Sequence, residues 1–81
     1  MRLLGRPCRL KLDKNGEPLL IKVNDKWVKV KWIGKRWRIK ECWWEEEREK
    51  EYFQIETEDG LICEISRDLK NGFSFIERVY D

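Results

Sequence analysis

Apolar and polar residues alternate along most of this chain, and short turn signals break the alternation into segments. Helix-type spacing of apolar residues is scarce, whereas period-two runs recur, and period two is the spacing of a half-buried β-strand. The turn signals lie at 13–16, 24–25, 33–34, 58–60 and 68–72. The pattern predicts a meander of about six or seven antiparallel strands.

The register of neighbouring strands can be tested, because a correct register places apolar residues opposite apolar residues on one face. A two-residue loop is expected at 24–25, a two- or four-residue loop at 33–34, and a three-residue loop ending in a left-handed Gly60. The expected pairs are Leu10–Leu19, Cys8–Ile21, Ile21–Val28, Val30–Trp37, Ile55–Cys63, Phe53–Ile65, Ile65–Phe75, Leu61–Val79 and, between 35–44 and 50–58, Ile39–Ile55.

One face stays apolar through all of these junctions, and agreement across independent turns favours the strand interpretation. A one-faced sheet of this length curls and closes on itself. Residues 1–81 are therefore predicted to form a single all-β domain, a small barrel or rolled sheet, with no helix except for a candidate turn at 44–50. The expected apolar face consists of Cys8, Leu10, Leu19, Ile21, Val28, Val30, Trp37, Ile39, Phe53, Ile55, Leu61, Cys63, Ile65, Phe75 and Val79.

The charge of the chain is nearly balanced but unevenly divided. The net charge is +2, from 18 Lys or Arg and 16 Asp or Glu, so no strong overall field draws the protein to DNA or membranes. Residues 26–40 carry seven bases and no acid, whereas 41–59 carry nine acids and two bases. Pairing the strands at 35–44 and 50–58 therefore brings opposite charges together.

The expected pairing places Arg36 opposite Glu58 and Arg38 opposite Glu56 on the outer face of the sheet. Opposite charges in such cross-strand pairs stabilise a sheet by roughly 0.2–1 kcal/mol each. One interpretation of the basic segment is therefore a solvated face that is paired internally. The cations that this interpretation leaves without partners are Lys22, Lys29, Lys31 and Lys35.

Aromatic residues accompany these charges. Trp27 is expected on the outer face, with Lys40 among its neighbours, either shielded by lysine stems or serving as a platform on which a nucleic-acid base stacks. Trp43 and Trp44 fall on opposite faces of one strand end, so both cannot enter the core. Other outward apolar side chains are Tyr52, Ile62, Ile76 and Tyr80. The candidate contact residues are Lys22, Trp27, Lys29, Lys31, Lys35, Arg36, Arg38, Trp44 and Tyr52.

Several kinds of chemistry are missing from the sequence. Histidine does not occur, which removes the commonest general base, and the five glycines form no phosphate-binding loop. The three cysteines include no Cys-x-x-Cys pair, so an ordinary zinc site is not expected. The acids at 45–51 are expected to be solvated. The sequence predicts a protein that is not an enzyme and uses no cofactor or metal.

The cysteines and the apolar runs bear on localisation. Cys8 and Cys63 are expected to be reduced and buried, and Cys42 to lie on the outer face opposite Tyr52. Reduced core thiols are typical of the cytosol. No apolar run approaches the roughly 18 residues of a membrane span, and the start of the chain lacks a signal-peptide core. The protein is expected to be cytoplasmic and not membrane-bound.

The second half of the chain carries a set of short motifs. They are KWIGKRWRI (31–39), CWWEEE (42–47), EYFQIETEDG (51–60), SRDLKNG (66–72) and FIERVYD (75–81). Together they resemble a family of small bacterial domains found alone or beside error-prone, Y-family-polymerase-like proteins of DNA damage tolerance. The spacing between Ile39 and Trp43 is shorter than is usual in that family, and Phe73 stands where Trp or Arg is common. The resemblance implies a setting in DNA repair and carries over no catalytic residues.

These observations predict a non-catalytic binding module, a protein-contact accessory in DNA repair or translesion synthesis. A homo-oligomer formed through the outward aromatics is compatible with that role and equally with direct nucleic-acid binding. The alternative is a small β-barrel that binds nucleic acid directly through the basic and tryptophan-bearing face of residues 22–40.

Overall fold

The computed structural model describes the backbone of residues 2–43 and 46–80, and the side chains of residues 5–40 and 47–80. The described residues form six antiparallel strands that close into a barrel, and they contain no helix. The predicted fold class is thereby confirmed. The strands are β1 (Arg2–Leu12), β2 (Pro18–Val23), β3 (Lys26–Trp43), β4 (Glu46–Thr57), β5 (Ile62–Asp68) and β6 (Ser74–Tyr80).

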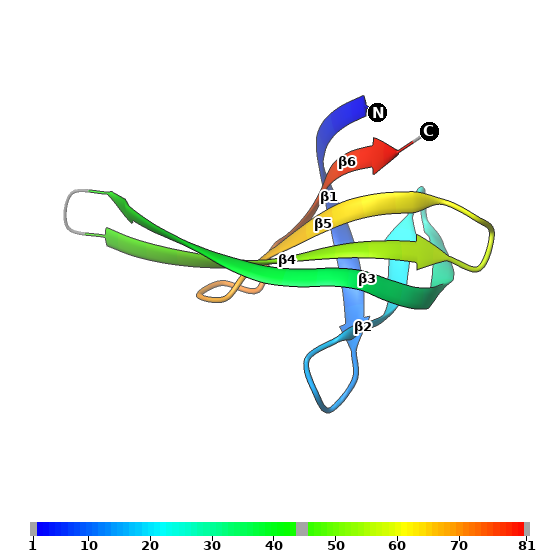
Figure 1. Cartoon of the computed structure of the whole chain (residues 1–81), viewed down its shortest axis with the longest axis horizontal. Helices are drawn as coiled ribbons and strands as arrows, with labels where there is room; N and C mark the ends of the chain where they lie inside the picture. The colour runs from blue at the N-terminus through cyan, green and yellow to red at the C-terminus, as the bar shows by residue number, and fades with distance from the viewer. Residues whose placement is uncertain (1, 44–45, 81) are drawn as a thin grey trace.

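Each strand pairs with the next one in sequence, and β1 pairs with β6 to close the barrel (Figure 1). Two long strands each change partner along their length. The first half of β1 pairs with β6 and its last four residues pair with β2. The first residues of β3 pair with β2 and the remainder pairs with β4. Because each of these two strands pairs with one neighbour at its start and with another at its end, the sheet can curve around the core. A meander of short strands, each paired along its whole length, would not do so.

The core is formed largely by the residues that the alternation placed on the apolar face. Its fully buried members are Ile21, Phe53, Ile55, Cys63, Ile65, Ile76 and Val79, with Cys8, Leu10, Val23, Val28, Val30, Ile33 and Leu61 packed against them. Some of the expected positions were wrong. Leu19 is 52% exposed and Ile39 is 41% exposed, whereas Ile76, which was expected to face outward, is buried. Trp37 and Phe75 are only half-buried.

Two of the turns agree with the sequence prediction. Asn24 and Asp25 both have positive φ, 50° and 63°, which is the conformation of a primed two-residue hairpin turn, and Ile21 pairs with Val28 across it. Gly60 has a φ of 89°, and the β4–β5 register pairs Ile55 with Cys63 and Phe53 with Ile65 as expected.

The turn predicted at 33–34 does not exist, because β3 runs through it without reversing. The register with β4 shifts between Ile33 and Lys35, so a bulge takes the place of the turn. Gly34 is not among the residues with positive φ. A Cβ on Gly34 would lie 2.7 Å from Cζ3 of Trp32, so the glycine lets that ring lie close to the backbone. The expected pairing of Val30 with Trp37 was therefore wrong.

Bulges also displace two other predicted registers. Leu10 pairs with Ile21, where the alternation had placed Leu19, and the β1–β2 register shifts just beyond it. Ile65 pairs with Ile76 instead of Phe75, because the register already differs by one residue at the turn, where Arg67 pairs with Ser74; the shift between Glu64 and Ile65 then moves Val79 by one residue more. Val79 accordingly faces Cys63 and not Leu61. A bulge adds a residue to one strand and reverses the phase of its alternation beyond that point, as in β6, where Ile76 and Val79 are both buried although they are three residues apart.

The hairpin of β3 and β4 extends beyond the other strands of the barrel. Ile33 faces Ile55, and Ile39 faces Lys50, so the expected pairing of Ile39 with Ile55 was wrong. Within the described residues, β5 pairs with β4 only between Lys50 and Glu56. The rest of the hairpin extends away from the barrel as a two-stranded arm (Figure 1).

Candidate functional site

Two of the candidate cations are committed to a buried carboxylate. Glu51 is 1% exposed, and its Oε2 accepts hydrogen bonds from Nε and Nη2 of Arg36, at 3.2 and 3.0 Å, and from Nε of Arg38 at 3.0 Å. The Arg36 guanidinium also lies 5.4 Å from the ring centroid of Phe53. Both arginines therefore close one end of the core, because a buried carboxylate needs charged partners.

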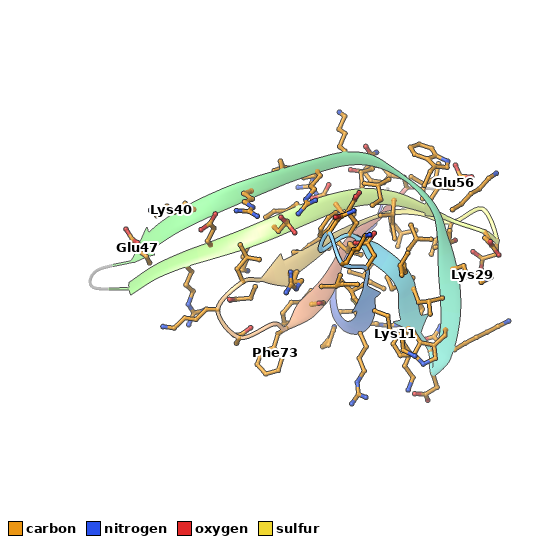
Figure 2. All side chains as sticks on the ribbon, turned by 90° about the horizontal axis from the view of Figure 1, so that it is seen from below. Lys11, Lys29, Lys40, Glu47, Glu56 and Phe73 are labelled. Carbon is orange, nitrogen blue, oxygen red and sulfur yellow. The ribbon has the colours of Figure 1, made fainter. Side chains whose placement is uncertain are left out.

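The remaining β3–β4 ion pairs are at the surface. Lys31 lies 3.8 Å from Glu56, and Lys40 lies 3.6 Å from Glu47. The uneven division of charge along the chain thus brings bases and acids together across this one hairpin (Figure 2). The individual partners differ from those expected, because Arg38 faces Glu51 and Arg36 faces Phe53 in the observed register.

A second group of cations has no acid beside it. Cross-strand pairing aligns Arg9, Lys22 and Trp27 in one row, and Lys11, Leu20 and Lys29 in the next. Leu10, Ile21 and Val28, which alternate with these residues, form part of the core, so the two rows point outward. We call these six residues the β1–β3 face. None of its four cations has an acidic partner within salt-bridge distance among the described residues.

Trp27 is the aromatic residue of the β1–β3 face and lies at its β3 end. Its side chain is 38% exposed, and the Nζ atoms of Lys11 and Lys22 lie 4.9 and 5.9 Å from its ring centroid. The structure thus brings Lys22, Trp27 and Lys29 together as predicted. Lys40 was expected beside them but lies on the β3–β4 arm, away from Lys11 and Lys29 (Figure 2).

Sequence reasoning missed Arg9 and Lys11 as members of this face. Their alternation with Leu10 indicated that they point outward. The erroneous pairing of Leu10 with Leu19 nevertheless separated them from the Lys22 row. Only the observed register aligns Arg9 with Lys22 and Trp27.

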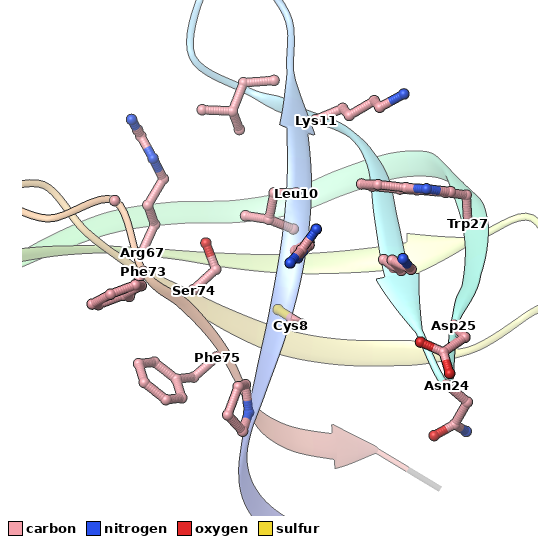
Figure 3. Close-up of a pocket in the computed structure, with 15 residues that line it drawn as sticks. Cys8, Leu10, Lys11, Asn24, Asp25, Trp27, Arg67, Phe73, Ser74 and Phe75 are labelled. Atoms are coloured by element: carbon pink, nitrogen blue, oxygen red, sulfur yellow. The ribbon is translucent and has the colours of Figure 1, made fainter.

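A hollow of about 1130 Å³ adjoins this face and extends to both sides of β1 (Figure 3). On one side it is lined by Lys22 and Trp27, and on the other by Arg67, Phe73 and Phe75. Its lining includes four cations, Arg9, Lys11, Lys22 and Arg67, and one acid, Asp25. Phe73 is 64% exposed and was not among the predicted contact residues. The hollow is therefore basic and has aromatic rings at both of its sides.

Three of the predicted contact residues lie elsewhere or have other roles. Lys35 is exposed on β3 opposite Gln54 and has no acidic partner among the described residues. Tyr52 stacks on Trp37 with ring centroids 5.5 Å apart. Trp44 lies outside the described residues, as does the side chain of Trp43.

Two of the three thiols are described by the structure, and Cys8 is also among the residues that line the hollow. Cys8 and Cys63 are free and contribute to the core. Burial raises the pKa of Cys8 to about 12 and that of Cys63 to about 11. The backbone of Cys42 pairs with Glu47, so its expected position opposite Tyr52 was wrong, and its side chain lies outside the described residues.

Two kinds of feature are missing from the described part of the chain. It holds no group of three or more Cys, Asp or Glu side chains able to bind a metal ion. It also has no helix with the length and apolar character needed to cross a membrane. Comparison of the whole chain with protein-family models, curated proteins and solved structures finds no match.

Proposed function

We propose that this chain is a non-catalytic nucleic-acid-binding module whose contact surface is the β1–β3 face. The observation that carries the proposal is the division of the cations into two groups. Along the β3–β4 hairpin, Lys31, Arg36, Arg38 and Lys40 pair with acids and Lys35 does not, whereas none of the four cations that share the β1–β3 face with Trp27 pairs with an acid among the described residues. Phosphates provide the missing counter-charge, and an exposed ring among cations suits a nucleotide base.

The low net charge is compatible with this proposal. A net charge of +2 gives little long-range attraction. Phosphate binding, however, depends on cations within a few ångströms of the nucleic acid, and these lie on one face. A DNA-repair setting and a reducing cytosol belong to the same proposal, supported by the family resemblance and by the free thiols Cys8 and Cys63.

Protein contact is the second candidate function, and a different surface favours it. Trp32 and Ile39 on β3 are 49% and 41% exposed, and both lie outside the β1–β3 face. Exposed apolar side chains on one strand suit a protein partner or a second copy of the chain. This role is compatible with nucleic-acid binding, because the two surfaces do not share residues.

Titration of labelled single-stranded and duplex DNA at two salt concentrations tests the first proposal. If four phosphates contact the four cations, the logarithm of the binding constant falls with the logarithm of salt concentration. The expected slope is about −3 for single strands and about −3.6 for duplex. Absence of binding below millimolar concentration at about 150 mM salt would refute the proposal.

A pair of charge-reversal variants locates the surface. Lys22→Glu/Lys29→Glu removes two cations of the β1–β3 face, and Lys35→Glu/Lys40→Glu makes the same change in net charge elsewhere on β3. The first variant is expected to abolish the measured binding, and the second to leave most of it. Equal losses in both would mean that the β1–β3 face is not the contact surface.

A further inference from the structure

The two exposed rings of the hollow lie on opposite sides of β1 (Figure 3). Trp27 is on β3, and Phe73 directly precedes β6. Ser74 pairs with Cys8, so Phe73 belongs at the end of the row that continues through Arg9 and Lys22 to Trp27. That row crosses four strands, a span of about 14 Å at a strand spacing of about 4.8 Å.

The loop that presents Phe73 is held by hydrogen bonds. Oδ1 of Asp68 accepts from the backbone N–H groups of Lys70 and Asn71, at 2.8 and 3.3 Å, and Oδ1 of Asn71 accepts from the N–H of Phe73 at 2.9 Å. Gly72 completes the turn with a φ of 78° and donates to the carbonyl of Asp68. These bonds hold the loop backbone in place, so a ligand need not order it to meet the ring.

Cations occupy the space between the rings. Arg9 and Lys11 are on β1 itself and Lys22 is on β2 between Arg9 and Trp27, whereas Arg67 is on β5, on the far side of β6 from β1. A nucleic-acid strand fits this arrangement when its bases stack on the two rings and its phosphates contact the cations between them. A duplex keeps its bases stacked against one another, so it cannot place them on separate protein rings, whereas a single strand can.

We infer that the site takes a single strand of nucleic acid that crosses β1, with one base stacked on Trp27 and another on Phe73. The inference rests on the proposed function and makes it specific. At the 3.4 Å rise of a fully stacked strand the 14 Å span would hold about four nucleotides, and this number is an upper limit because bases that stack on the protein rings leave the strand more extended.

The experiment compares a labelled thymidine homopolymer of about 10 nucleotides with a duplex of equal length. Trp27→Ala and Phe73→Ala are each expected to weaken single-strand binding by about 5- to 150-fold and to leave duplex binding unchanged. Trp27→Phe and Phe73→Tyr keep a ring and are expected to retain binding. The matched controls, Trp32→Ala and Leu19→Ala, truncate exposed apolar side chains outside the row and are expected to have no effect.

The outcomes separate this inference from the proposed function. Equal affinity for single strand and duplex, with Phe73→Ala unchanged and Lys22→Glu/Lys29→Glu still defective, would overturn the inference and leave the proposed function standing. Absence of any binding would overturn both. Circular dichroism of each variant shows whether its fold is intact, and the ring-retaining variants keep the test decisive if an alanine variant unfolds.

Discussion

At the scale of single residues, Glu51 determines the role of two arginines on β3. Its buried carboxylate joins two arginines that would otherwise add to the free positive charge of the surface. Both arginines are partly exposed, so water screens the pairs on one side only. Arg36 and Arg38 are therefore structural residues and not members of the candidate contact surface: both pair with Glu51, and Arg38 also pairs with Glu49 at 3.7 Å.

Glu51→Ala is expected to lower the free energy of unfolding by about 1–3 kcal/mol, because it removes three charge-assisted hydrogen bonds at the end of the core. Urea denaturation measures the change. Glu47→Ala is the matched control on the same strand: Glu47 is 67% exposed and pairs only with Lys40 among the described residues, so its loss should cost under about 0.5 kcal/mol. Equal effects of the two substitutions would contradict the structural role of Glu51.

The core thiols are expected to react slowly with iodoacetamide. The reactive species is the thiolate, and a pKa raised from 9.0 to about 11 lowers its fraction at neutral pH by about 100-fold for Cys63. The rise to about 12 lowers it by about 1000-fold for Cys8. Labelling should accelerate about tenfold per pH unit up to about pH 11, measured by mass spectrometry of peptides.

Cys42 serves as the reference for the labelling experiment. The alternation of the sequence predicts Cys42 on the outer face, so we expect it to react faster than Cys8 and Cys63. Rapid modification of Cys8 and Cys63 in the native protein would show that they are not core residues. Unfolding in urea should bring all three thiols to similar rates, because burial is the main cause of the two raised pKa values.

At the scale of elements, β3 shows how one glycine can be misread. A turn and a bulge both favour glycine, and the sequence around Ile33–Gly34 suits either. The structure uses Gly34 to accommodate the ring of Trp32, whose Nε1 donates to Oε1 of Glu56 at 3.1 Å. The resulting strand is long enough to join the two parts of the sheet.

A double-mutant cycle tests this account of Gly34. In the Trp32→Ala background, Gly34→Ala should stabilise the protein by roughly 0.5–1 kcal/mol, because the backbone loses less entropy on folding and nothing obstructs the new methyl group. In the native background the methyl group displaces the ring and its hydrogen bond, so the gain should shrink or reverse. Denaturation of all four proteins gives the coupling, expected at about 0.5–1.5 kcal/mol. Simple additivity would contradict the contact.

At the scale of the whole molecule, the barrel has one small core, so we expect its free energy of unfolding to be low. Ile55 is 1% exposed and lies between Ile33 and Cys63 in the sheet. Ile39, by contrast, lies on the β3–β4 arm and is 41% exposed. The two isoleucines were expected to pair in the core, so the same substitution at each distinguishes the observed register from the expected one.

Ile55→Asp is expected to unfold the domain, because an unpaired buried charge costs several kcal/mol against a total stability of about 5–15 kcal/mol. Ile39→Asp is expected to remain folded, because its carboxylate can stay in water. Far-ultraviolet circular dichroism should show a β-type spectrum for the native protein and for Ile39→Asp only. A folded Ile55→Asp variant, or an unfolded Ile39→Asp variant, would contradict the observed register.

The sequence allowed part of the candidate site to be predicted. Lys22, Trp27 and Lys29 lie on either side of a two-residue turn whose register is local, so their shared face follows from alternation. Phe73 gave no comparable signal, because an exposed ring in a loop has no periodicity. Its position opposite Trp27 across β1 depends on the closure of the barrel between β1 and β6.

The sequence by itself determined the all-β class, the turns at 24–25 and 58–60, and most of the core, because period-two alternation and turn chemistry act between neighbouring residues. Only the tertiary structure decided where the bulges lie, that β3 continues through Gly34, and which cations meet acids. A bulge adds a residue that the partner strand does not match, so it reverses the phase of the in–out alternation on the bulged strand and moves every charge beyond it to a new partner. Cations that meet acids and cations that do not are therefore indistinguishable in the sequence. Only the strand pairing of the closed barrel distinguishes them.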